Sequence, residues 1–161
     1  MTTTFRLAVL ALGIAVSAFA ADAEVPAELA IYSSQSGSLP PQYAWSTSVT
    51  IYLDGQVAVQ HCRGYETEGP ACTTSNAQTT PEAIASILDA VKASNLTTKA
   101  AVENPSPPVG GGSSHAVIFV DGKSITLPPF VIAADADRVA AVLRAIEAAV
   151  PASDAHFLTG G

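Results

Sequence analysis

The sequence predicts an α+β fold in which an antiparallel sheet of about four to five strands carries two helices on one face. A β-rich run at residues 48–59 recurs loosely at residues 115–127, and each copy contains an Asp-Gly pair. Asp-Gly supplies the positive φ angles that a tight hairpin needs. Each copy is followed by apolar residues at helical spacing. The chain is therefore predicted to contain a duplicated β-hairpin-plus-helix unit.

The register of each hairpin follows from the need to bury one face of the sheet. In the first hairpin, a type I turn with Gly55 in a left-handed bulge position aligns Val49 with Val59 and Ile51 with Val57. This register gives one apolar face. In the second hairpin a two-residue turn already achieves this, and its expected pairs are Ile118 with Ile125 and Ala116 with Leu127.

Both helices have clear boundary signals. Thr80 can cap the first helix and Pro81 suits its first position, whereas Asp135 or Asp137 opens the second and Pro151 ends it. The apolar stripes expected against the sheet are Ile84, Ile87, Leu88 and Val91, then Val139, Val142, Leu143, Ile146 and Val150. The charged residues expected in water are Asp89, Lys92, Arg138 and Glu147.

The N-terminal residues predict export. Arg6 precedes the apolar or small run at residues 7–20, and Ala18-Phe19-Ala20 fits the cleavage rule for a signal peptide. The apolar run is shorter than a membrane-spanning helix requires, so no stable membrane insertion is expected after cleavage. The predicted organisation is a signal peptide at 1–20, an extension at 21–27, one domain at 28–151 beginning with a short strand at 29–32, and a flexible tail at 152–161.

The acidic composition narrows the range of partners. Cleavage after residue 20 would leave 6 basic and 14 acidic side chains, a formal charge of −8. Non-specific nucleic-acid binding depends on Lys and Arg, so nucleic acid is not an expected partner. A secreted or periplasmic location follows from the signal peptide.

The two cysteines, Cys62 and Cys72, are predicted to form a disulfide bond. An exported chain meets an oxidising compartment, and the polar, turn-rich segment at residues 63–71 would gain from a cross-link. The alternative is a catalytic thiol or a metal site. That alternative requires C-x-x-C spacing or several nearby His residues, and only His61 is adjacent.

The predicted topology gathers four loops at the end of the sheet opposite the Asp-Gly turns. These loops cover residues 33–45, 62–79, 103–114 and 128–134. Long loops on a rigid scaffold commonly carry binding sites. The binding hypothesis rests on the first loop, which combines a Pro pair with two aromatic residues; its candidate residues are Ser36, Gly37, Leu39, Pro40, Pro41, Tyr43 and Trp45. The sequence leaves open whether Tyr43 and Trp45 are core or contact residues.

Catalytic and metal-binding patterns are weak. The triple Gly at 110–112 lacks the Lys-Ser/Thr of a phosphate loop. Ser114 and His115 could supply a nucleophile and a base, but neighbouring residues of a strand point to opposite faces. Contact between His61 and His115 is conceivable because they hold matching positions in the two units. No metal, cofactor or catalytic residue is predicted.

Several motifs together resemble emfourin-type small bacterial proteins. They are the segment Ser33-Ser34-Gln35-Ser36-Gly37 after a short strand, the hairpin at Thr50–Gly55, a helix opening at Pro81-Glu82, a second hairpin at Asp121-Gly122 and a terminal helix. Emfourin-type proteins inhibit thermolysin-type metalloproteases. The resemblance therefore implies a protein partner and, more specifically, a protease.

The sequence favours an exported, non-catalytic binding protein, with protease inhibition through residues 36–45 as the specific hypothesis. Two alternatives remain. The first is a small-ligand or cell-envelope interaction protein that uses the groove between sheet and helices. The second is a minor hydrolase that depends on Ser114 and His115.

Overall fold

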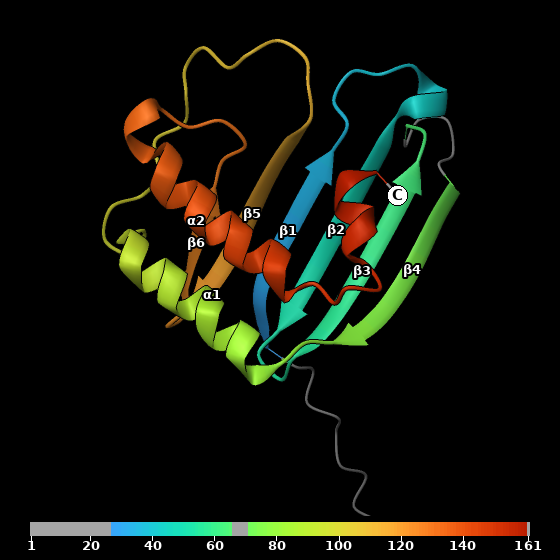
Figure 1. Cartoon of the computed structure of the whole chain (residues 1–161). Coiled ribbons are helices and arrows are strands. Elements are labelled where there is room, and N and C mark those ends of the chain that lie inside the picture. Colours follow the sequence, from blue (N-terminus) through green and yellow to red (C-terminus); the bar gives the residue numbers. More distant parts are fainter. Residues whose placement is uncertain (1–26, 66–70, 161) are drawn as a thin grey trace, which may run out of the picture.

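The computed structural model describes residues 27–65 and 71–160, so the predicted signal peptide and nearly all of the N-terminal extension lie outside the described residues. The fold is α+β, as expected: a six-stranded antiparallel sheet of order β4-β3-β2-β1-β5-β6 carries two helices on one face (Figure 1). The strands are β1 (Glu28–Gln35), β2 (Trp45–Tyr52), β3 (Gln56–Arg63), β4 (Ala71–Gln78), β5 (Ser113–Val120) and β6 (Lys123–Leu127). The helices are α1 (Pro81–Ser94) and α2 (Ala133–Ala149), with short 3₁₀ helices η1 (Pro41–Tyr43) and η3 (Ala155–Thr159).

Strand β1 is central, and one predicted hairpin lies on each side of it. Because β2 and β5 both pair antiparallel with β1, they run in the same direction and end at the same end of the sheet. The two Asp-Gly turns therefore lie together at the lower end in Figure 1. The connections that follow β1, β3 and β6 lie at the opposite end.

The predicted registers are confirmed in both hairpins. Val49 pairs with Val59 and Ile51 with Val57, and Gly55 has a φ of 87°, as a left-handed bulge requires. The second hairpin has the tighter turn, with φ of 51° at Asp121 and 70° at Gly122. Its pairs are Ile118 with Ile125 and Ala116 with Leu127.

The core lies between the helices and one face of the sheet. Alternate residues of the strands supply the sheet side, and the predicted stripes of α1 and α2 supply the other. Thr80 caps α1 as expected, because its side chain accepts a hydrogen bond from the Ala83 N–H. Leu88 of the predicted stripe is instead 36% exposed. Within the described residues, no helix combines the length and the apolar character needed to cross a membrane.

Two strands differ from expectation. β1 extends to Gln35, three residues beyond the predicted end, so part of the expected loop at 33–45 is strand. β4 occupies a segment that was assigned to the loop at 62–79. Its sequence, ACTTSNAQ, has no alternation of large apolar residues, because an edge strand with mostly exposed side chains needs none. The sheet therefore has one strand more than the sequence predicted.

The start of α2 also differs. The helix begins at Ala133, and Asp135 lies in its first turn. Its carboxylate is buried and accepts hydrogen bonds from the Val102 N–H (2.8 Å) and from Arg138 Nε (2.9 Å), and these interactions hold the pKa of Asp135 below its ordinary value. Arg138 also donates to the carbonyls of Lys99 and Ala100. Arg138 thus joins α2 to the segment after α1 and is not the solvated charge that was predicted.

The prediction of a flexible tail over residues 152–161 differs from the structure. Residues Ala155–Thr159 form η3, which Figure 1 shows lying over β2 and β3 beside α2. Phe157 and Leu158 pack against the core, and Asp154 is buried. The apolar pair was the signal for this docking, since burying it offsets the entropy of ordering the end of the chain.

Candidate functional site

The first candidate surface is the end of the sheet opposite the Asp-Gly turns, where the loop at 36–44 joins β1 to β2. This loop is closed at its base: Ser36 N–H donates to the Trp45 carbonyl (3.1 Å), and Trp45 N–H donates to Ser36 Oγ (3.1 Å). Pro40 and Pro41 then lead into η1, where Tyr43 N–H donates to the Pro40 carbonyl (2.8 Å). Two prolines and these hydrogen bonds restrict the backbone of the loop.

Neighbouring segments support the loop from both sides. On one side, Gly64 N–H donates to the Ala44 carbonyl (2.9 Å), and the Tyr65 hydroxyl donates to the Leu39 carbonyl. On the other side, a Cβ at Gly37 would lie 1.9 Å from the carbonyl oxygen of Gly111. Only glycine fits there, and Gly37 also has a φ of 75°. The loops at 36–44 and 103–112 are therefore in direct contact.

This arrangement leaves apolar side chains exposed at the rim. Leu39 is 41% exposed, Tyr43 is 65% exposed, and Val109 in the adjacent loop is fully exposed. We call Leu39, Tyr43 and Val109 the rim cluster. The sequence left open whether Tyr43 and Trp45 are core or contact residues. In the structure Tyr43 is exposed, whereas Trp45 is half-buried beneath the C-terminal segment.

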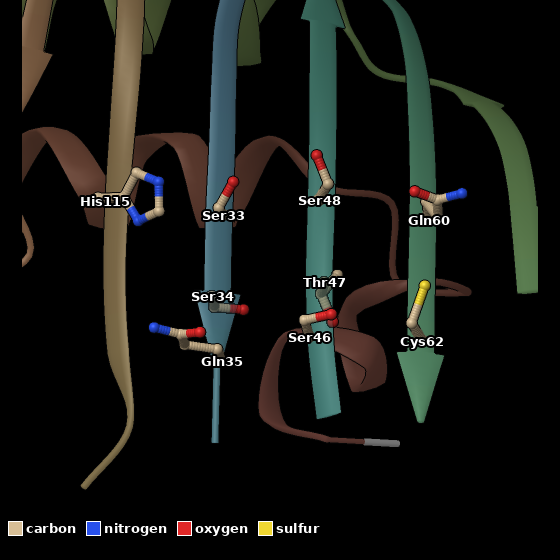
Figure 2. A pocket seen from close by; sticks show the side chains of 9 residues that line it. All are labelled: Ser33, Ser34, Gln35, Ser46, Thr47, Ser48, Gln60, Cys62 and His115. Carbon is tan, nitrogen blue, oxygen red and sulfur yellow. The ribbon is translucent and has the colours of Figure 1, made fainter. Parts of the chain in front are cut away.

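The second candidate surface is the face of the sheet that carries no helix. A hollow of about 390 Å³ lies on this face, between β5 and β3. Figure 2 shows the side chains that line it. Ser33, Ser48, Gln60 and His115 form one row across the strands, and Gln35, Ser46 and Cys62 form the next. These rows carry serine hydroxyls, glutamine amides, the disulfide-bonded Cys62 and the His115 imidazole. The hollow offers hydroxyl and amide hydrogen-bonding groups, with no fixed charge to select an ionic ligand.

A third site is a cleft of about 500 Å³ on the helix side, between α2, β5 and η3. Two of its lining side chains, Glu147 and Ser114, contact the buried Tyr32, whose Oη lies 2.7 Å from Glu147 Oε1 and 2.9 Å from Ser114 Oγ. The phenol has one proton, so it donates to the carboxylate and accepts from the Ser114 hydroxyl. Burial, with a further contribution from the Glu147 carboxylate, raises the pKa of Tyr32 to about 12. Apolar walls come from Trp45, Phe130, Leu143 and Leu158.

Glu147 was expected in water, but it is half-buried and bonded to Tyr32. Neither Tyr32 nor Glu147 was identified as a site residue from the sequence. Tyr32 lies on β1 and Glu147 on α2, 115 positions apart in the sequence, so no local pattern connects them.

The Ser114–His115 pair is separated by the sheet. Ser114 bonds to Tyr32 on the helix side, whereas His115 lines the hollow on the opposite face (Figure 2). The contact between His61 and His115 that the sequence left conceivable is not formed, because His61 is buried on the helix side against Phe157, whereas His115 lies on the opposite face. Ser114 and His115 therefore do not act together as a nucleophile and a base. Among residues 27–65 and 71–160, no three His, Cys, Asp or Glu side chains are grouped to hold a metal ion.

The predicted disulfide bond is confirmed. Cys62 and Cys72 are direct cross-strand partners on β3 and β4, with their Cα atoms 4.0 Å apart. The bond was expected to restrain a loop. It instead fixes the edge strand β4 to β3, near the end of the sheet opposite the Asp-Gly turns.

Comparison of the chain with known proteins gives no matching family model and no curated relative of significant similarity.

Proposed function

We propose that this chain is an extracytoplasmic, non-catalytic protein that binds another protein through the loop at residues 36–45. The observation that carries this proposal is the exposure of Leu39 and Tyr43 in a loop whose base and flanks are held by hydrogen bonds. Anchors that are ordered before binding lose little entropy in a complex. Aromatic and large apolar side chains commonly carry most of the binding energy of an interface.

The proposal also places the protein outside the cytoplasm. The signal-peptide pattern at residues 1–20 and the Cys62–Cys72 disulfide both suit a compartment outside the cytoplasm. The acidic charge of −7 disfavours nucleic acid as the partner.

The specific partner class to test is a secreted protease. The resemblance to emfourin-type proteins supports thermolysin-type metalloproteases, and the loop itself has features that resist cleavage. A protease binds its substrate as an extended strand, whereas residues 41–43 form a 3₁₀ turn that follows Pro40 and begins with Pro41. We expect mature protein to reduce the activity of a thermolysin-type protease at near-equimolar amounts while remaining intact on a gel.

The test of the wider proposal is a pull-down from the extracytoplasmic fraction with the wild type and with the Leu39→Ala/Tyr43→Ala variant. The control is Leu53→Ala, which removes another exposed leucine (50%) at the opposite end of the sheet. We expect a captured protein to be lost from the double variant and retained by the control. If the wild type, the double variant and the control capture the same protein equally, Leu39 and Tyr43 do not contribute to binding and the proposal is wrong. If the protease cleaves the protein and keeps its own activity, the protease is excluded as the partner, but another protein partner is not.

The helix-side cleft favours a second candidate function, the binding of a small amphipathic molecule. Its apolar walls suit an apolar body, and Glu147, held by Tyr32, suits a hydrogen-bond donor or an amine. Native mass spectrometry of the purified protein would detect such a ligand as an added mass. We expect Glu147→Gln to lose the added mass and Glu82→Gln, on the exposed side of α1, to keep it.

A further inference from the structure

The face of the sheet that carries no helix has an unusual charge distribution. The alternate residues of β2 to β6 that point to this face, and those of β1 from Ile31 onward, include no Asp, Glu, Lys or Arg. Charged residues instead occupy α1, α2 and both Asp-Gly turns. The formal charge of −7 on the whole chain repels anions, and this face has no carboxylate to hold a cation. A neutral ligand therefore fits this face best.

The hydrogen-bonding groups of this face are gathered in the hollow of about 390 Å³ (Figure 2). One row across four neighbouring strands consists of Ser33, Ser48, Gln60 and His115, and we call it the polar row. Within the described residues, the side chains of the polar row have no hydrogen bond or ion pair with the rest of the protein. A ligand can therefore replace water on these groups without breaking a hydrogen bond inside the protein.

The length of the polar row sets the size of the ligand. The row crosses the sheet from β5 through β1 and β2 to β3. Neighbouring strands lie about 4.8 Å apart, so these four strands span about 14 Å. A ligand that meets the whole row must carry hydroxyl or amide groups along a comparable length. This length exceeds that of a single sugar ring.

The next row toward the Asp-Gly turns is partly apolar. Ile31 and Val117 are cross-strand partners there, Phe119 follows on the same face, and all three side chains are half-buried. A sugar combines the two chemistries, since hydroxyl groups surround the edge of its ring and C–H groups cover the ring faces. A protein surface fits less well. Serine is depleted in the cores of protein interfaces, and the polar row contains no Trp, Tyr or large apolar anchor.

We propose that this face binds a neutral oligosaccharide, which places hydroxyl groups on the polar row and the face of a sugar ring on Ile31 and Val117. The site is separate from the rim cluster, which lies in the loops at the end of the sheet. It also takes a different class of ligand from the protein partner proposed above.

The test is a titration of isotope-labelled protein with cellohexaose, maltohexaose and chitohexaose, followed by the chemical shifts of the backbone amides. We expect at least one of these hexasaccharides to cause saturable shifts in the polar row and at Ile31 and Val117. No saturable shift with any of them at about 5 mM, where even a complex with a millimolar Kd is mostly formed, would overturn the proposal. Shifts confined to the helix side of the sheet would also overturn it.

A pair of double variants locates the site. Gln60→Ala/His115→Ala removes two exposed groups of the polar row and is expected to weaken binding by about tenfold or more. The matched control is Asn76→Ala/Ser124→Ala, which removes two exposed polar side chains from the outer strands of the same face and is expected to leave the affinity unchanged. Equal affinity of the two double variants would show that the polar row does not bind the sugar.

The rim variant Leu39→Ala/Tyr43→Ala separates this proposal from the proposed protein binding. It is expected to bind the hexasaccharide with the affinity of the wild type, because its changes lie outside the hollow. Loss of sugar binding in this variant would contradict a site on the open face of the sheet.

Discussion

His61 is a buried imidazole that the structure keeps neutral. Thr47 donates its only hydroxyl proton to the Phe157 carbonyl (2.6 Å), so His61 Nδ1 must donate to Thr47 Oγ1 (2.9 Å). Nε2 is then a buried acceptor without a partner among the described residues. Burial, together with the electrostatic influence of Arg63 and His156, lowers the pKa of His61 from its ordinary 6.5.

This environment predicts a loss of stability in acid. Because the pKa of His61 is lower in the folded than in the unfolded chain, the unfolded chain takes up this proton first as the pH falls. The free energy of unfolding is therefore expected to fall as the pH drops below 6.5. Urea titrations from pH 8 to pH 5 measure this dependence.

His61→Gln is expected to flatten the pH dependence between pH 7 and 5, whatever its effect on stability at pH 8. His115→Gln is the control, because His115 is exposed on the other face of the sheet. An unchanged slope in His61→Gln would show that another group is responsible.

At the scale of single elements, β4 depends on its neighbour more than on its own sequence. Its side chains are mostly exposed and small, so backbone pairing with β3 and the disulfide bond hold it in place. The disulfide closes a loop with a sequence separation of 10, and such a bond typically contributes about 2–4 kcal/mol.

We predict that Cys62→Ser/Cys72→Ser lowers the free energy of unfolding by about 2–4 kcal/mol and leaves the other five strands folded. Hydrogen exchange is expected to accelerate first in residues 71–78, since this strand has the fewest core contacts. Reduction of the wild type serves as a comparison. If the reduced wild type and the double variant both have the same free energy of unfolding and the same exchange in residues 71–78 as the oxidised protein, β4 does not depend on the disulfide bond.

The helices and hairpins behave differently, because their own sequences specify them. Thr80 and Pro81 lie where their local preferences place them, and Ile84, Ile87 and Val91 of the predicted α1 stripe are buried. Asp121 and Gly122 both adopt the positive φ angles that the Asp-Gly pair predicted. Local signals of this kind require no knowledge of the rest of the chain.

For the whole molecule, the C-terminal segment completes the core above β2 and β3. The Phe157 ring stacks on His61 with centroids 4.9 Å apart, and a Cβ at Gly160 would lie 2.6 Å from Trp45 Nε1. The segment thus covers the side of Trp45 that faces the helices and helps to set the base of the loop at 36–44.

Phe157→Ala is predicted to lower the free energy of unfolding by about 2 kcal/mol, less than for a fully buried phenylalanine because Phe157 is half-buried. Since Trp45 is the only tryptophan, its fluorescence reports directly on this region, and a shift to longer wavelength is expected. Leu88→Ala, on the exposed side of α1, is the control and is expected to leave the emission unchanged. Unchanged emission in Phe157→Ala would contradict the covering role of this segment.

The sequence alone determined the fold class, both hairpin registers, the two helices and the Cys62–Cys72 bond. Each of these follows from interactions between residues close in the chain, or from a periodicity that only one buried face can satisfy. The tertiary structure alone decided that residues 71–78 form a strand, that Phe157 docks on His61 and that Tyr32 meets Glu147. These contacts join segments far apart in the sequence, where burial and backbone pairing in the assembled sheet outweigh local preference.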